Sequence, residues 1–465
     1  MISRKLNLFI AKRLAGAALL IFVLSTCTVM AQGAQVDISV GLESGITTGT
    51  ISSSGAITAV DASGRRVNLG KSVNFRAESG LRTLVMGKTK ANLPVTFTSS
   101  HYLSWKGRPY RGFLRLVPSA GGLAVVNVLP VEDYLKGVLK MEVNPAWPME
   151  VLKAQAIVAR TYAIKGRGRH RSEGFDLCAL PHCQVYRGVN AEDPKLSQAI
   201  KVTSGMVITY QGNLALVFYH ADSGGYTADV KDVWGGSYPY LRPVAEPFSY
   251  QSPYSQWSLS LPLKEIENRL RRAGFDVGVL LGLQFESTSP GGRVDSVILN
   301  GSMGTQKISG HAFRMALGPN ELRSTTFSVD GIQPKAVATN PTSSPTTPSS
   351  ASSNAGENTL IALTKQGCFT PDELIDMLMH PEKRQHYVQK ALSKRKSPIL
   401  PSIPTPTVTP TPTRTAGGIV SFYGRGWGHG VGMSQWGAKA MAERGWSARQ
   451  ILNHYYPNTE ISKLY

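Results

Sequence analysis

The segment Val131-Glu-Asp-Tyr-Leu-Lys-Gly-Val-Leu-Lys-Met-Glu142 decides how the centre of this chain folds. Its apolar residues Leu135, Val138 and Leu139 recur at helical spacing, and Glu142 takes the next position of the same stripe. Burial removes water from a carboxyl group and raises its pKa. A carboxylic acid that stays protonated near neutral pH is suited to general acid catalysis. The alternative is a frayed helix end, where Glu142 would point into water.

A second helix is expected directly after this segment. The Pro-rich corner 143–148 ends the first helix, and its last proline suits the first position of the next one, which spans 149–164. That helix is apolar almost all round, which indicates a central buried position. Arg160 on it needs an anionic partner, such as Glu142, Asp133 or a substrate group, unless its charged head reaches solvent.

The rest of the sequence indicates an α+β fold. Residues 35–130 alternate β-type runs with Gly, Asn and Ser turns, which is typical of a β-rich domain. We expect strands at 36–42, 56–60, 95–98, 113–117 and 123–129. We expect a catalytic core with the helix pair over 131–331, with a further helix near 263–273, and the C-terminal part of that core over 418–465, helical from 432 to 456.

A Pro/Thr/Ser-rich insert interrupts this core at 332–417. Its low-complexity flanks lack the apolar residues that a core requires, and they bracket an amphipathic stretch that predicts a short helix from Thr370 to Ala391. Residues 324–329 and 418–424 both resemble strands. We therefore expect these two strands to pair and the insert to leave from the tip of their hairpin.

The N-terminus and the charge indicate export. A basic leader precedes an apolar run that ends in small residues, which predicts a secretory signal peptide over 1–31; a single membrane anchor is the alternative. The formal net charge is +20, part of it in the leader and part in the stretch 383–396. Because nucleic-acid-binding motifs are lacking, we interpret this charge as affinity for anionic wall polymers or membrane, with no nucleic acid as partner.

Four sequence blocks, in this order, resemble the stage II sporulation protein D family. The blocks are 142–163, with its Leu-Lys-Ala-Gln-Ala helix and Ala-Arg-Thr-Tyr end, 176–188, 219–227, and the glycine-rich 424–438. The resemblance implies a lytic transglycosylase that acts on peptidoglycan glycan strands, particularly strands stripped of stem peptides, with Glu142 as its catalytic acid. One carboxyl would protonate the bond between MurNAc and GlcNAc and then accept the C6 hydroxyl proton, which closes a 1,6-anhydro ring. The insert is not covered by the resemblance.

The same blocks supply the candidate substrate-binding residues. In the glycine-rich block, close glycines bring the backbone near a ligand, so Trp427 is a candidate for stacking on a sugar and His429 for hydrogen bonding; tight packing around a satisfied histidine is the alternative. His220 and Ser223, with Asp222, are too crowded in sequence for a hydrolase triad, and we assign the first two to sugar binding or support of the cleft. The full set of candidates is Arg160, Tyr162, Gln184, Tyr186, His220, Ser223, Trp427, His429, Ser434 and Gln435.

A small group of cysteines and histidines indicates a structural site. His170, Cys178, His182 and Cys183 form a Cys₂His₂ set, which is a normal zinc ligand set, although the spacing is not that of a standard finger. The family resemblance supports zinc, because some members carry a metal here. A Cys178–Cys183 disulfide, natural in an oxidising compartment, and free thiols stay open as alternatives. In each case we expect a structural role, with no cofactor required for the chemistry.

Two classes of function fit this sequence. The first is the lytic transglycosylase. The second is a non-catalytic binding protein that enhances a cell-wall N-acetylmuramoyl-L-alanine amidase, because related amidase enhancers share the fold. A metalloenzyme is disfavoured, because no open ligand set of the His/Glu type is visible.

Overall fold

The structure is a computed structural model, and it describes residues 35–287, 289–329, 335–336, 384–393 and 418–465. The predicted signal peptide or anchor therefore lies outside the described residues, as do most of the insert and the first part of its predicted helix. Within the described part of the chain, no helix combines the length and apolar character needed to cross a bilayer.

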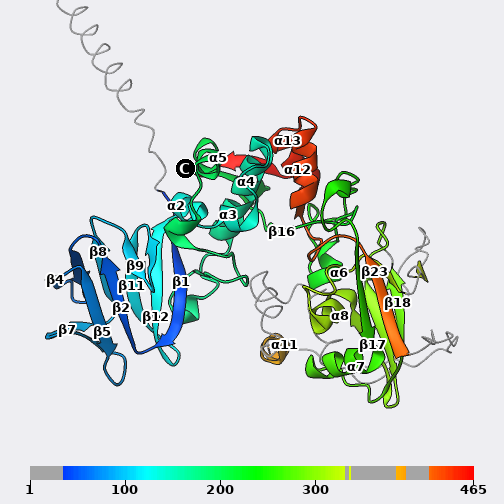
Figure 1. The fold of residues 1–465 in the computed structure, drawn as a ribbon, viewed down its shortest axis with the longest axis horizontal. Coiled ribbons are helices and arrows are strands. Elements are labelled where there is room, and N and C mark those ends of the chain that lie inside the picture. Colours follow the sequence, from blue (N-terminus) through cyan, green and yellow to red (C-terminus); the bar gives the residue numbers. More distant parts are fainter. Residues whose placement is uncertain (1–34, 288, 330–334, 337–383, 394–417) are drawn as a thin grey trace, which may run out of the picture.

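The N-terminal part is a β-structure of two sheets, seen in blue and cyan in Figure 1. Its strands are β1 (Asp37–Ile46), β2 (Thr48–Ser53), β3 (Ile57–Val60), β4 (Arg66–Leu69), β5 (Ser72–Ala77), β6 (Thr83–Met86), β7 (Thr89–Asn92), β8 (Val95–Ser99), β9 (Leu103–Trp105), β10 (Arg108–Tyr110), β11 (Phe113–Ser119) and β12 (Gly122–Pro130). One sheet has the order β13-β1-β12-β11-β8-β3-β4, in which β13 (Leu177–Cys178) comes from later in the chain, and the other has the order β10-β9-β2-β5-β6-β7. The five strands expected here are confirmed as β1, β3, β8, β11 and β12. Buried residues mostly alternate with less buried ones in the first four, and β12 is buried along nearly its whole length.

The middle part holds the helix pair. Its elements are α2 (Val131–Lys136), α3 (Leu139–Glu142), α4 (Met149–Lys165), η1 (Arg171–Glu173), β13 (Leu177–Cys178), η2 (Gly188–Ala191), α5 (Pro194–Val202), β14 (Met206–Tyr210), β15 (Asn213–Leu214), β16 (Tyr219–His220) and α6 (Val230–Trp234). The helix expected over 131–142 is broken between α2 and α3 at Gly137. A Cβ atom at that position would lie 2.4 Å from the ring of Tyr186, so the chain turns where Tyr186 packs. The predicted stripe of Leu135, Val138 and Leu139 is nevertheless completely buried.

The last part contains a smaller lobe and the C-terminal helices. Its elements are η3 (Ser249–Gln251), β17 (Trp257–Pro262), α7 (Leu263–Arg272), β18 (Leu280–Ser287), β19 (Ser296–Gly301), β20 (Gly304–Ser309), α8 (Gly310–Leu317), β21 (Phe327–Val329), β22 (Lys335–Ala336), α11 (Arg384–Ser393), β23 (Ile419–Gly424), β24 (Met433–Ser434), α12 (Gln435–Glu443), α13 (Ala448–Tyr455) and β25 (Glu460–Lys463). The predicted hairpin around the insert is confirmed, because β21 and β23 pair antiparallel with Phe327 opposite Gly424. Figure 1 shows β23 in orange among the green strands of this lobe.

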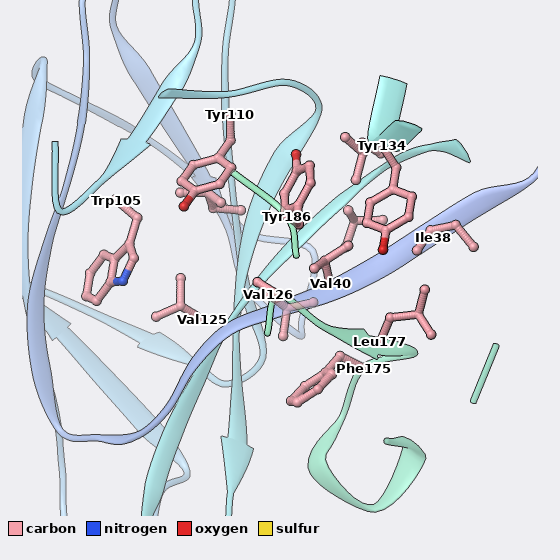
Figure 2. Packing of buried hydrophobic residues seen from close by; sticks show 14 of the residues in the cluster. Ile38, Val40, Trp105, Tyr110, Val125, Val126, Tyr134, Phe175, Leu177 and Tyr186 are labelled. Carbon is pink, nitrogen blue, oxygen red and sulfur yellow. The ribbon is translucent and has the colours of Figure 1, made fainter. Parts of the chain in front are cut away.

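The hydrophobic core does not divide at residue 130. One core cluster combines both N-terminal sheets with residues from α2, α4 and α5. Figure 2 shows this contact, where Tyr134 from α2 and Tyr186 lie beside Ile38 and Val40 of β1. A second cluster lies between α4, α12 and α13, and a third fills the smaller lobe. Helix α4 therefore shares its apolar residues between two clusters, which explains why it is buried almost all round.

Candidate functional site

Glu142 lies at the end of α3, and its carboxyl group is enclosed by neutral polar side chains. Loss of hydration raises its pKa to about 7, and this rise is opposed by side-chain hydrogen bonds with Tyr219 and Gln435. The residue keeps part of its surface exposed, so the group is both desolvated and reachable. The rise in pKa expected from the helical stripe is confirmed. Such a carboxyl exchanges a proton near neutral pH, which is what a general acid and base requires.

Tyr219 on β16 is a site residue that we did not select from the sequence. Its hydroxyl hydrogen-bonds with Glu142 and accepts a hydrogen bond from Gln184 Nε2 at 3.1 Å. Gln184 Oε1 in turn accepts from the hydroxyl of Tyr134 at 3.1 Å. A buried chain of neutral donors and acceptors thus orients the phenol toward the acid. The sequence block 219–227 includes Tyr219, but we selected only its neighbour His220. Neighbouring strand residues point to opposite faces, so choosing one of them leaves out the side chain on the other face.

Gln435 reaches Glu142 from the start of α12. Its Nε2 also contacts Gln155 Oε1 of α4 at 3.5 Å. The parallel pairing of β16 with β24, Tyr219 opposite Met433 and His220 opposite Ser434, brings the two halves of the site together. Gly432 makes this approach possible, because its φ is +72° and a Cβ there would lie 2.1 Å from the carbonyl oxygen of Phe218.

The buried Ser434, Ser223 and His220 support this junction. Ser434 is the N-cap of α12, and its hydroxyl accepts from the backbone N–H groups of Gly437 and Ser223, each at 3.2 Å. Ser223 donates to Glu246 Oε2 at 2.7 Å instead of to a histidine, so it is not part of a catalytic triad. The ring of His220 contacts the carbonyl of Val431 at 3.2 Å, and burial lowers its pKa to about 3. Both side chains contact groups within the protein, and their roles in sugar binding or support of a cleft stay predictions.

Arg160 and Tyr186 were predicted to bind substrate, and the structure corrects both. Arg160 is fully buried and binds Glu132 with two hydrogen bonds of 2.9 and 2.7 Å, so its partner is neither Glu142 nor Asp133. Tyr186 is 1% exposed, and its hydroxyl donates to Asn127 Oδ1 at 2.8 Å. Both side chains belong to the core, because their polar atoms already have partners within the protein.

Three other predicted residues keep part of their surface exposed: Tyr162, Trp427 and His429. The ring of Tyr162 lies 6.3 Å from that of Tyr219. His429 lies 4.8 Å from the ring of Trp234, and its Nδ1 accepts from the N–H of Val431 at 3.0 Å. Burial of the imidazole lowers the pKa of His429 well below its usual value, so this ring is neutral.

The four predicted metal ligands converge. One ligand atom from each of His170, Cys178, His182 and Cys183 lies within 4.8 Å of all the others. The two cysteines are not bonded to each other in the structure. Nδ1 of His170 lies 2.6 Å from Glu173 Oε1, which leaves its Nε2 to face the two sulfur atoms. Two sulfur and two imidazole donors at this spacing fit a closed tetrahedral zinc site.

Comparison with known proteins places this site in a family context. The family described as stage II sporulation protein matches residues 119–210, which include Glu142, α4 and the Cys/His cluster. The chain is 27% identical over 401 residues to an amidase enhancer of Bacillus subtilis (strain 168), a match that covers 84% of this chain and 50% of that protein. It is 24% identical over 356 residues to stage II sporulation protein D of Bacillus amyloliquefaciens, covering 73% of this chain and 76% of that protein. An uncharacterised protein of Brachyspira hyodysenteriae is 28% identical over 254 residues, with 54% of this chain and 67% of that protein covered. The match to the amidase enhancer thus spans half the length of that relative.

Proposed function

Because the chain belongs to the stage II sporulation protein D family, we propose that it is a lytic transglycosylase that cleaves peptidoglycan glycan strands with Glu142 as the single catalytic acid and base. The family supports a function at the cell wall. The observation that carries the finer proposal is the desolvated carboxyl of Glu142, with a pKa of about 7 and no cationic partner among the groups that shift it.

The chemistry needs one carboxyl group in two protonation states. Protonated Glu142 donates to the glycosidic oxygen between MurNAc and GlcNAc as the bond from C1 breaks. The resulting carboxylate then accepts the proton of the muramyl C6 hydroxyl while that oxygen bonds to C1. The products are a 1,6-anhydromuramyl end and a free hydroxyl on the leaving sugar, so no water is consumed. A pKa near 7 makes both transfers accessible at neutral pH.

Tyr219 and Gln435 would hold the carboxyl in place without fixing its charge. A neighbouring lysine or arginine would lower the pKa of Glu142 and keep the group ionised. The two neutral side chains that contact it instead orient it while leaving the protonated form populated. Gln184 fixes Tyr219 in turn, which makes both of them positioning residues.

Zinc would have a structural role in this proposal. His170, Cys178, His182 and Cys183 would hold the ion, and it would fix the loop that leads into Gln184. Elemental analysis of the purified protein should then find about one zinc per chain, and chelation should lower the melting temperature. If reductant lowers the melting temperature and the metal content is nil, the cysteines form a disulfide instead.

A second candidate function is enhancement of a cell-wall amidase. It is favoured by the relative named amidase enhancer, whose match extends over most of this chain. In that case the cleft would bind glycan without cleaving it, and a separate amidase would be the partner. The wall is the expected location in both cases, and the predicted signal peptide would serve this export.

One experiment separates the two functions. The purified mature protein is incubated with peptide-free and with peptide-bearing glycan strands, and the products are analysed by mass spectrometry. A lytic transglycosylase produces anhydromuramyl ends, and we expect more of them from the peptide-free strands. Absence of these ends, together with faster stem-peptide release when the protein is added to an amidase, would favour the enhancer.

A further inference from the structure

Two tryptophans from the segments that supply Glu142 and Gln435 contact each other. Trp147 lies in the corner that follows Glu142, and Trp436 follows Gln435 at the start of α12. Their ring centroids are 5.1 Å apart in an edge-to-face contact. Both rings keep part of their surface exposed. The corner after Glu142 and the start of α12 therefore each contribute a partly exposed ring to one aromatic contact.

Two further aromatic rings extend this contact. Tyr254 lies 6.4 Å from Trp436 and 4.6 Å from Trp427, again edge to face. The guanidinium carbon of Arg323 lies 5.5 Å from the centre of the Trp427 ring. Tyr254, Trp427 and Arg323 are all partly exposed. We call Trp147, Trp436, Tyr254 and Trp427 the aromatic row.

The aromatic row differs in burial from most of the aromatic group in the core of the smaller lobe. Phe313, Phe327 and Phe422 pack around Phe422 in a core cluster and are each at most 4% exposed, whereas Phe285, which contacts all three, keeps part of its surface exposed. The members of the row come from segments far apart in sequence and still remain partly exposed.

The backbone holds the row in place. The N–H and C=O of Trp427 both pair with Asp222, at 2.9 and 3.0 Å. The carbonyl of Tyr254 accepts from Gly426, and the N–H of Trp436 donates to Ala221. A ligand would therefore meet rings whose backbone is already ordered, which reduces the entropy cost of binding.

We propose that the aromatic row forms additional sugar subsites along the glycan strand, and that Arg323 at its end binds the lactyl carboxylate of a muramyl residue. This inference rests on the proposed function, because it assumes that the strand enters at Glu142. The C–H faces of pyranose rings are apolar and pack on aromatic rings, while the sugar hydroxyls stay in water. The four rings are linked by successive contacts, so the row offers repeated contact points that suit a ligand built of repeated sugar units.

Arg323 is the cation suited to this carboxylate. Lys439, which lies over the ring of Trp436, already pairs with Glu443 at 2.6 Å. Within the described residues, Arg323 forms no ion pair. A guanidinium binds a carboxylate through two hydrogen bonds, and the lactyl group carries a free carboxylate only after the stem peptide has been removed. The aromatic row would thus lengthen the contact between the protein and the glycan strand. Arg323 would distinguish peptide-free strands from peptide-bearing ones.

Binding assays in a Glu142→Gln background test the proposal without cleavage. The ligands are peptide-free muramyl glycans of increasing length, and chitin oligomers, which have the same ring backbone without lactyl carboxylates. We expect Trp427→Ala to weaken binding of long oligomers of both kinds by about tenfold. Arg323→Gln should weaken only the muramyl glycans. The shortest oligomers should bind equally to all variants. Tyr102→Ala is the matched control, because this exposed tyrosine also carries a stacked arginine, Arg111, but lies in the N-terminal β-structure.

Three results would overturn the inference. The first is unchanged affinity for long oligomers in both Trp427→Ala and Tyr254→Ala. The second is an equal loss for short and long oligomers, and the third is an equal loss for chitin and muramyl ligands in Arg323→Gln. Trp427→Phe retains an aromatic ring and should keep most of the affinity, which guards against misfolding of the alanine variant. If the wild type makes no anhydromuramyl ends but this binding pattern is found, the proposed reaction fails and the subsites stand.

Discussion

Glu132 and Glu142 belong to the same short helical segment and have opposite environments. Burial alone would raise the pKa of Glu132, but the hydrogen bonds and charge of Arg160 hold it below its usual range. Glu132 also accepts from Ser204 at 3.2 Å and from the N–H of Gly205 at 3.0 Å. Glu142 contacts the neutral side chains Tyr219 and Gln435, and burial raises its pKa to about 7.

The difference separates a carboxyl group whose charge is matched from one that can change its protonation state near neutral pH. Glu132 is ionised and its charge is matched, so it ties α2 to α4. Glu142 lacks a cation and can change its protonation state near neutral pH. The charge of the neighbouring side chains, and not burial alone, therefore decides whether the pKa of each carboxyl group is raised or lowered. The following variants test that distinction.

Glu142→Gln should have the largest effect on activity. The amide keeps the shape and the hydrogen bonds but cannot transfer a proton, so the rate of cleavage should fall roughly 10²–10⁴-fold. The yield of anhydromuramyl ends measures this. The melting temperature should not fall, because the variant removes no matched charge. If cleavage is undiminished, Glu142 is not the acid.

Arg160→Met should have the largest effect on stability. It leaves the carboxylate of Glu132 buried without its cation, and breaking such a pair costs about 3–5 kcal/mol. Denaturant unfolding at neutral pH measures the loss. The double variant Glu132→Gln/Arg160→Met removes both charges and should recover part of the stability. If the single variant is as stable as the wild type, the ion pair does not hold α2 to α4.

The two acids should give stability opposite dependences on pH. Glu142 binds its proton more tightly when folded, so its contribution is complete below about pH 4.5 and is lost as the pH rises through about 7. Glu132 has a lowered pKa, so its contribution is present above its unfolded pKa and is lost as the pH falls through the folded one. The melting temperature of Glu142→Gln, compared with that of the wild type at the same pH, should therefore increase as the pH rises to about 7. Cleavage should fall about tenfold per pH unit above that pKa, since the protonated acid is depleted.

Tyr219→Phe should have the smallest effect. The hydroxyl hydrogen bond lowers the pKa of Glu142, so its removal should move the alkaline limit of activity to higher pH. The pH profile of cleavage is the readout, because a merely structural defect would lower the rate without moving the limit. Tyr162→Phe is a matched control, since its hydroxyl contacts Arg169 at 2.7 Å and not Glu142.

Local features of this fold could be predicted from sequence. The helix 149–164 and the buried stripe of α2 and α3 follow from apolar spacing, and the Cys/His cluster follows from residue types close together in the chain. The break at Gly137 could not be foreseen, because it depends on where Tyr186 packs. Likewise, spacing shows that Arg160 needs an acid but does not show which acid the fold supplies.

The candidate site was harder to predict than the fold. Glu142 stood out because an acid on an apolar stripe is unusual. Tyr219 was missed because its role depends on a strand pairing between residues far apart in the chain. Membership of a characteristic motif also does not show whether a residue contacts a ligand or another part of the protein. Ser223 lies in such a motif, and its hydroxyl donates to Glu246.

The parallel ladder of β16 and β24 has a consequence for biosynthesis. Glu142 emerges from the ribosome long before Met433 and Gln435, which lie far later in the chain. A chain truncated before Met433 would carry the acid without β24, without Gln435 and without the junction that seats Tyr219. Fragments that end before β24 would therefore lack the assembled candidate site, which can form only after Gln435 has been translated.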